Sequence, residues 1–425
     1  MKPIYSLAIL FISIIISTVT TNATPKKSEP EKKGSEKAEE IVPKDPKAKV
    51  AWFRKRAEQG SVEAQFNLGV MYEAGDGVLK DEKAAISWFQ KAAEQGYAEA
   101  QYNLGVMYSS GLGILKDEKT ARIWYQKAAE QGYAKAQCNL GIMYSNGEGG
   151  ILEDKKVARM WYQKAAEQGN VEAQFNLGVM YDFGTGIQKD KKVAVSWYRK
   201  AAEQKYVDAQ YNLGMMYFNG DGVLKDKKKA AKWFRKAAEQ GSAKAQFNLG
   251  IMYSNGTGVL KDEKEGVKWC QKAAEQGYAN AQCNLGVMYS NGSGVLKDEK
   301  AAISWFQKAA EQGYAEAQYN LGVIYSSGLG ILKDKKTARM WYQKAAEQGY
   351  AEAQFNLGII YSKGEGVPVN KEEAYAWFLL SGMNGVKNGI KNKNLLKKEL
   401  TPYQLTTALK RAREIQKRIK KYAEQ

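Results

Sequence analysis

The feature that most constrains the fold is a tryptophan that returns every 36 residues. The ten tryptophans lie at positions 52, 88, 124, 161, 197, 233, 269, 305, 341 and 377. Only the third interval is longer, by one residue, which Gly149–Gly150 supplies. An Asn-Leu-Gly triplet recurs with the same period nine times, from Asn67 to Asn356. A fixed period of this length is typical of repeat architectures, so we predict nine repeats that follow a half-unit carrying Trp52.

The first half of each repeat has the pattern of an amphipathic helix. In residues 97–132, Ala100, Leu104 and Tyr108 lie four apart and form one apolar stripe. Gly105 offers a site where a neighbouring helix can approach closely. The glycines of the following turn, beginning with Gly111, predict the end of this helix and a reversal of the chain.

The second half of each repeat predicts another helix. Asp117 is placed to cap its N-terminus by accepting hydrogen bonds from free backbone amides. Trp124 and Tyr125 fall on the buried face, and Gly132 closes the helix in the left-handed conformation. Lys205 replaces this closing glycine in one repeat, which predicts a strained lysine there.

The combined pattern, A-x-A-Q-x-N-L-G-x-x-Y-x-x-G-x-G followed by D-x-x-x-A-x-x-W-Y-x-K-A-A-E-Q-G, closely resembles the Sel-one-like repeat, a relative of the tetratricopeptide repeat. The resemblance implies an all-α, right-handed α-solenoid superhelix whose first helices line a concave groove that binds proteins or peptides. It also implies a role as an adaptor or scaffold, often at the envelope or in host contact for exported bacterial members. We predict a solenoid over residues 49–385, with a half-unit and then repeats at 61–96, 97–132, 133–169, 170–205, 206–241, 242–277, 278–313, 314–349 and 350–385.

The segment before the repeats has two parts. Residues 1–23 combine Lys2, a short apolar run and small residues, which predicts a secretory signal peptide cleaved after Ala23. An uncleaved N-terminal anchor is the alternative. Residues 24–48 are charged and almost free of large apolar groups, which predicts a disordered linker. We therefore expect an exported protein, either periplasmic or secreted.

The segment after the repeats, residues 386–425, is basic. It carries a net charge of +9 out of +18 for the whole chain. Thr401, Pro402 and Gln404 make a strong helix start, and an apolar stripe follows. We predict a C-terminal capping helix that covers the last repeat. Its basic face is either simply solvated or binds an anionic envelope surface, and no nucleic acid partner is expected.

Composition argues against catalysis. The chain has no histidine, so the commonest general base and metal ligand is missing. Cys138, Cys270 and Cys283 take positions held by aromatic residues in other repeats, which indicates core substitutions. Carboxylates such as Glu94, Glu99 and Asp117 recur in many of the repeats as caps and surface charges, without the single break in the periodicity that an acid/base pair should make. We predict no catalytic, metal or cofactor-binding residue. The alternative is an enzyme, or enzyme modulator, acting on peptidoglycan in the envelope.

Candidate partner-binding residues fall into two groups. One asparagine per repeat occupies the same helical position, either lining the groove or satisfying polar groups between repeats. These are Asn67, Asn103, Asn139, Asn176, Asn212, Asn248, Asn284, Asn320 and Asn356. Phe183 and Phe218 are aromatic where other repeats carry small or polar residues, either as binding residues or as drift between copies. The sequence thus predicts a non-catalytic, exported scaffold that binds a protein or peptide in its groove.

Overall fold

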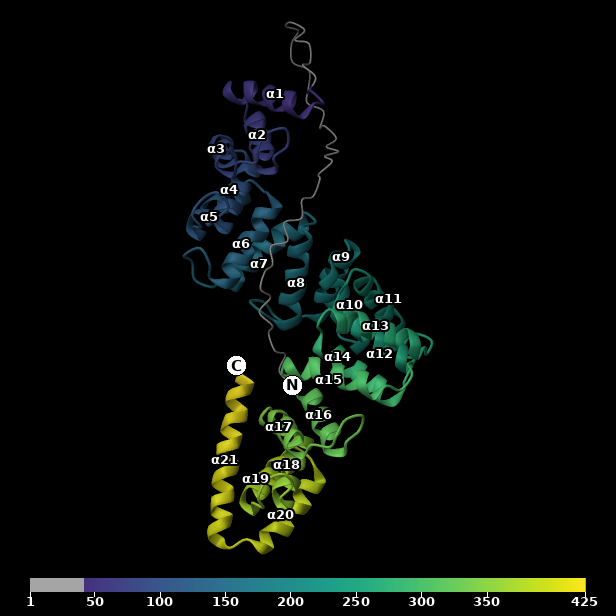
Figure 1. Ribbon diagram of the computed structural model, residues 1–425. Helices are drawn as coiled ribbons and strands as arrows, with labels where there is room; N and C mark the ends of the chain where they lie inside the picture. The colour runs from purple at the N-terminus through teal and green to yellow at the C-terminus, as the bar shows by residue number, and fades with distance from the viewer. Residues whose placement is uncertain (1–41, 425) are drawn as a thin grey trace, which may run out of the picture.

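The computed structural model describes residues 42–424, and these form an elongated superhelix of helical hairpins (Figure 1). The predicted signal peptide and most of the predicted linker, residues 1–41, lie outside the described residues. The described residues contain 21 helices and no strand, which confirms the predicted all-α repeat solenoid.

The first helices of the repeats carry even numbers. They are α2 (Val62–Ala74), α4 (Ala98–Ser110), α6 (Ala134–Asn146), α8 (Val171–Phe183), α10 (Val207–Asn219), α12 (Ala243–Asn255), α14 (Ala279–Asn291), α16 (Ala315–Ser327) and α18 (Ala351–Lys363). The second helices carry odd numbers. They are α3 (Glu82–Glu94), α5 (Glu118–Glu130), α7 (Lys155–Glu167), α9 (Lys191–Glu203), α11 (Lys227–Glu239), α13 (Glu263–Glu275), α15 (Glu299–Glu311), α17 (Lys335–Glu347) and α19 (Lys371–Met383).

Within a repeat the two helices pack very closely. A Cβ atom added to Gly105 in α4 would lie 2.5 Å from ring carbons of Tyr125 in α5, so only glycine allows this approach. Ala100, Leu104 and Ala121 are fully buried around the same contact. Small residues on both helices therefore set the distance at which the hairpin closes.

The predicted helix ends are confirmed. Asp117 accepts hydrogen bonds from the backbone amides of Lys119 and Thr120, at 3.0 and 3.1 Å. Gly111 ends α4 in the left-handed conformation. Lys205 is the only described non-glycine residue with a positive φ, at 68°, so the predicted strained position is confirmed as well.

A row of buried glutamines, which we call the glutamine ladder, joins successive repeats. It was not predicted from the sequence. Gln101 in α4 is buried, and its Nε2 donates to the Ala93 carbonyl at 3.0 Å. Its Oε1 accepts from Nε2 of Gln131, which follows α5, at 2.7 Å. The ladder glutamines are Gln65, Gln101, Gln137, Gln174, Gln210, Gln246, Gln282, Gln318 and Gln354. Asn384 takes the place of the following glutamine in the last repeat.

The two ends of the solenoid differ from the prediction in detail. The first helix, α1 (Pro46–Glu58), begins three residues before the predicted boundary at residue 49, because the Asp45 side chain accepts from the Ala48 amide and Pro46 takes the first turn. At the other end the predicted capping segment, residues 386–425, contains two helices, α20 (Lys387–Glu399) and α21 (Pro402–Glu424), and α21 begins at Pro402 as the start signal predicts.

Helix α21 covers the last repeat. Its Ala412 and Ile415 are buried with residues of α17 and α19 in one core cluster. Arg411 on α21 also forms an ion pair with Glu373 on α19, with Nε and Oε2 2.7 Å apart. The apolar face that the last repeat would otherwise expose is therefore closed.

Candidate interaction surface

The first helices meet along one face of the solenoid, which we call the inner face. Helix α6 contacts α8, the first helix of the next repeat. The pKa of Tyr102 in α4 is raised by burial and then by Cys138 of α6 and Glu172 of α8. Side chains of first helices two repeats apart therefore interact electrostatically here. Such convergence places the inner face on the concave side of the superhelix.

The predicted asparagine ladder lies on the inner face. All nine asparagines are half-buried. Asn248 Nδ2 lies 3.4 Å from the hydroxyl of Tyr211 in the preceding repeat, and Asn67 Nδ2 donates to the Glu63 carbonyl at 2.8 Å. Asn284 and Asn320 contact the sulfur atoms of Cys270 and Cys283. The asparagines thus contact residues of their own and neighbouring helices and remain partly accessible. Their role in partner binding stays a prediction.

The two candidate phenylalanines have different surroundings. Phe183 is 47% exposed at the end of α8. Phe218 is half-buried, packs against the core cluster around Leu213, and has the Lys227 ammonium 5.9 Å from its ring centroid. Of the two, Phe183 offers the larger apolar surface to a partner.

An aromatic row along the inner face was not predicted. The ring of Tyr102 in α4 packs against Tyr133, which precedes α6, with ring centroids 5.2 Å apart. The same pairing joins Phe66 to Tyr97, Phe175 to Tyr206, Phe247 to Tyr278, and Tyr319 to Tyr350. The signal was available in the sequence as a tyrosine that precedes most first helices without a capping side chain.

The three cysteines are buried and unpaired, which agrees with their predicted place in the core. Burial raises the pKa of Cys138 to about 12 and that of Cys270 to about 11. Such thiols stay protonated near neutral pH and are poor nucleophiles.

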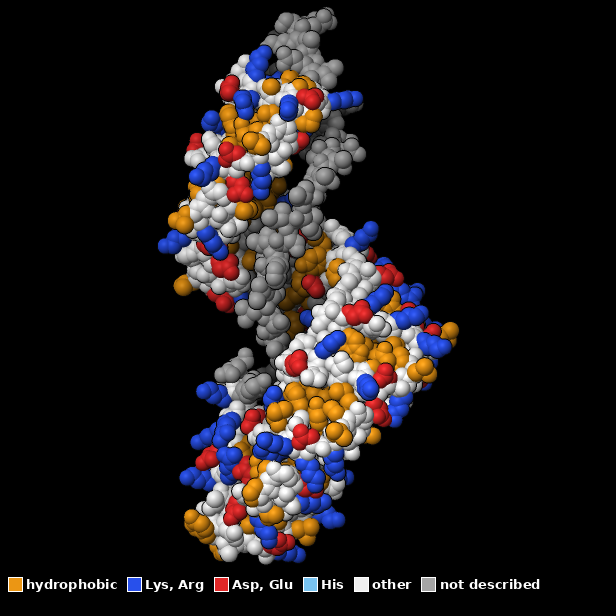
Figure 2. Space-filling model, viewed as in Figure 1, with side chains coloured by type: hydrophobic (Ala, Val, Ile, Leu, Met, Phe, Trp, Pro, Cys, Tyr) orange, Lys and Arg blue, Asp and Glu red, His pale blue; other side chains and the backbone are white. Residues whose placement is uncertain are grey.

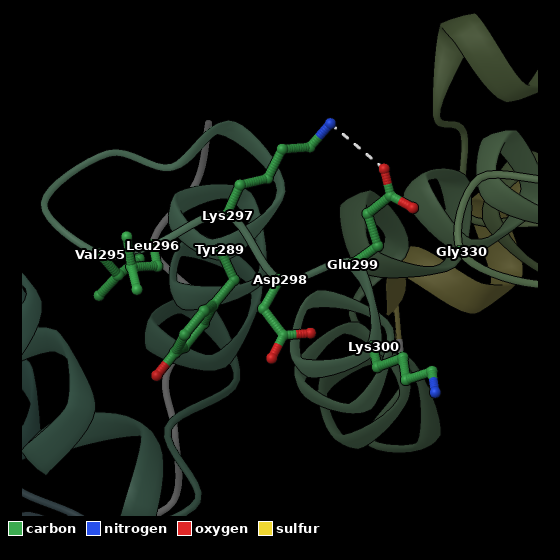
Figure 3. A pocket seen from close by; sticks show the side chains of 8 residues that line it. All are labelled: Tyr289, Val295, Leu296, Lys297, Asp298, Glu299, Lys300 and Gly330. Carbon is green, nitrogen blue, oxygen red and sulfur yellow. Dashed lines mark ion pairs between the residues drawn. The ribbon is translucent and has the colours of Figure 1, made fainter.

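A pocket lies on the turn before α15 (Figure 3). It has a volume of about 800 Å³, and an equivalent pocket of 580 Å³ lies on the turn before α3. Three of its four charged groups are engaged, because Lys297 pairs with Glu299 at 3.2 Å and Asp298 caps α15. Leu296, 91% exposed, adds an apolar rim. The pocket is a product of the repeated turn, since the turn before α3 forms an equivalent one.

Nowhere between residues 42 and 424 do three or more histidine, cysteine or acidic side chains gather in a way that would hold a metal ion. In the same part of the chain no helix is both long enough and apolar enough to cross a membrane.

Comparison with known proteins agrees with this architecture. The model of the Sel1 repeat matches nine consecutive segments: 62–97, 98–133, 134–170, 171–206, 207–242, 243–278, 279–314, 315–350 and 351–386. These begin one residue later than the predicted boundaries. Comparison with curated proteins gave no match.

Two solved structures are similar in both sequence and shape. One is a protective antigen of uropathogenic Escherichia coli with an SLR fold, 36% identical, with 88% of each chain covered and a TM-score of 0.62. The other is a Sel1 repeat protein of Oxalobacter formigenes, 34% identical, covering 73% of this chain and 90% of that one with a TM-score of 0.59. With nine matched repeats and these two relatives, the chain belongs to the Sel1 repeat family.

Proposed function

We propose that this protein is a non-catalytic, exported scaffold that binds a protein or peptide along its inner face, at the cell envelope or in contact with a host. Sel1 repeat proteins generally mediate protein–protein interactions. The observation that carries the proposal is the inner face, on which a half-buried asparagine recurs in all nine repeats and a pair of aromatic rings recurs at five places. Repeated polar and aromatic groups at one spacing suit additive contacts to an extended ligand.

Substitution of the asparagine ladder tests partner binding. The chain from residue 24 onward is immobilised and exposed to envelope and culture-medium fractions of the producing organism. A variant with Asn212→Ala, Asn248→Ala and Asn284→Ala is expected to lose the captured partner while its melting temperature stays within a few degrees. Exposed Gln90, Gln271 and Gln307, changed to alanine together, serve as the control on the second helices. Equal capture by both variants would reject the inner face as the binding surface.

Export has a separate test. The N-terminal segment is fused to a reporter enzyme that is active only outside the cytoplasm, and the mature N-terminus is sequenced. We expect reporter activity and a mature chain that starts at residue 24. An inactive reporter would reject export, whereas an active reporter on an uncleaved chain would indicate an anchored protein.

The basic face of α21 supports a second candidate, binding to an anionic envelope surface. Lys410, Arg413, Lys417 and Arg418 are all exposed on this helix. Figure 2 shows Lys and Arg side chains projecting along the edges of the molecule. Sedimentation with anionic vesicles is expected to fall when these four residues are changed to glutamine, and unchanged sedimentation would remove this candidate.

A further inference from the structure

The charges of the solenoid are unevenly shared between its two sets of helices. The first helices α2–α18 contain eight acidic and three basic residues, a net charge of −5. The second helices α3–α19 contain 15 acidic and 29 basic residues, a net charge of +14. The inner face is therefore acidic in a protein that is strongly basic as a whole.

The acidic residues of the inner face gather around particular tyrosines. The Tyr97 ring packs on Phe66 of α2, with ring centroids 5.1 Å apart. Glu63 lies three residues before Phe66 on the same helix, and Glu99 lies two residues after Tyr97 in the first turn of α4. Both carboxylates contribute, after burial, to the raised pKa of Tyr97.

The same arrangement occurs at two further places. Tyr206 packs on Phe175, which lies three residues after Glu172, and Asp208 lies two residues after Tyr206. Tyr350 packs on Tyr319, which lies three residues after Glu316, and Glu352 lies two residues after Tyr350. In both places burial and then these carboxylates raise the pKa of the tyrosine to about 12. We call these three groups of one tyrosine and two carboxylates the acidic clusters. Five of their six carboxylate residues are exposed and Glu99 is half-buried.

The other repeats break the arrangement. The residue equivalent to Glu99 is Lys135 in the next repeat, Lys244 three repeats further on, and Asn280 in the repeat after that. Tyr133, Tyr278 and Tyr314 therefore have at most one carboxylate of this kind beside them. The chain thus contains an internal control: three tyrosines have two carboxylates of this kind beside them, whereas Tyr278 has none.

We propose that the inner face recognises an extended basic segment of a partner protein, whose lysine or arginine side chains enter the three acidic clusters. A tyrosine ring beside two carboxylates suits a cation, because the ring face and both oxyanions attract it. Exposed carboxylates draw such a segment in from solution and align it along the groove. This inference rests on the proposed function, since it names the class of partner that the inner face takes.

The test uses a fluorescein-labelled peptide of repeated Lys-Ser-Gly units and the full chain from residue 24. Anisotropy titrations are expected to show binding that weakens with added salt, and no binding of a matching Glu-Ser-Gly peptide. Equal binding of the two peptides would overturn the proposal.

Two matched sets of variants locate the site. Changing Glu63, Glu99, Glu316 and Glu352 to glutamine is expected to weaken binding by about tenfold or more. Changing Glu94, Glu130, Glu275 and Glu311 on the second helices, which removes the same total charge, is expected to change it less than about twofold. Equal weakening would mean that the peptide responds to net charge alone, and the proposal would be wrong.

The tyrosines provide an independent readout. Tyr206→Leu is expected to weaken peptide binding several-fold more than Tyr278→Leu, because Tyr278 packs on Phe247 in the same way but has Lys244 and Asn280 at the two carboxylate positions. Melting temperatures of both variants report any loss of folding. If the asparagine variant loses a captured partner but the glutamine variant of the acidic clusters binds that partner and the basic peptide normally, only this inference fails.

Discussion

Lys205 is a position at which a side chain destabilises the folded repeat. It follows α9 with a φ of 68°, where eight of the other closing positions of this kind carry glycine with φ between 86° and 94°. A side chain in this region crowds the backbone, so the native state carries a cost that glycine removes.

Replacing Lys205 with glycine is therefore expected to raise the free energy of unfolding by about 1 kcal/mol. Thermal or urea unfolding followed by circular dichroism measures the change. Lys189→Gly, which falls in the turn before α9, is the control and should not stabilise. An unchanged or lower midpoint for Lys205→Gly would contradict the assigned strain.

Because the thiols are buried, we predict that the folded state loses stability at alkaline pH. In the unfolded chain cysteine has a pKa of about 8.5, whereas burial raises that of Cys138 and Cys283 to about 12. Above pH of about 9 the unfolded state releases thiol protons first, so stability falls as pH rises toward 11 and is unaffected below that window. The slope approaches about 1.4 kcal/mol per pH unit for each thiol.

Unfolding midpoints at pH 8 and pH 10.5 check this. A variant with all three cysteines changed to alanine is expected to show a smaller fall between the two values, since its tyrosines titrate as before. An equal fall would mean that the thiols do not contribute.

At the scale of elements, the glutamine ladder holds one hairpin to the next. Gln246 donates to the Ala238 carbonyl at 3.0 Å and accepts from Gln276 at 2.7 Å. Loss of its amide removes both of these hydrogen bonds, each of which contributes about 0.5–1.5 kcal/mol.

Gln246→Leu is expected to lower the free energy of unfolding by about 2 kcal/mol or more. Gln271→Leu is the matched control, because Gln271 is exposed and bonds only Glu275 on its own helix. Chemical unfolding of both variants gives the comparison. A similar effect of the two changes would show that the ladder adds nothing to stability.

Helix α21 is predicted to act as a removable cover. Ile415→Asp puts a charge against α17 and α19, so we expect the free energy of unfolding to fall by about 3 kcal/mol and the protein to self-associate through the uncovered repeat. Lys417→Asp, at an exposed position of the same helix, should do neither. Unfolding curves and light scattering report the two effects, and a monomeric, fully stable Ile415→Asp protein would contradict the covering role.

The sequence was sufficient for features that depend on local chemistry. Asp117 as a cap, Gly111 as a helix end and the burial of Leu104 follow from residue type and spacing. The glutamine ladder could not be found this way, because glutamine on a helix is usually exposed and its burial results from the neighbouring repeat. The pairing of Tyr97 with Phe66 and two carboxylates also needs the superhelical geometry, which brings residues of successive repeats together.

At the scale of the molecule, the solenoid is modular. Residues 81–134 and 298–351 differ at three positions only. A variant lacking residues 81–297 therefore loses six repeats, while the sequence that follows the new junction is almost unchanged. Because each repeat packs on its neighbours, we expect it to stay helical and to unfold cooperatively at a lower midpoint. An insoluble or molten product in circular dichroism and calorimetry would contradict the modular description.

The glutamine ladder also restricts how such a chain can change length through evolution. Each amide donates to a backbone carbonyl of the preceding repeat and accepts from the glutamine at the end of its own hairpin, so the series has a fixed direction and a fixed position within the period. Recombination between copies preserves it only when the exchanged pieces keep the same orientation and the same point in the period. Proteins that arise from this one by such recombination should therefore differ by whole repeats. The length of the binding surface can then change in evolution while the core of each repeat stays the same.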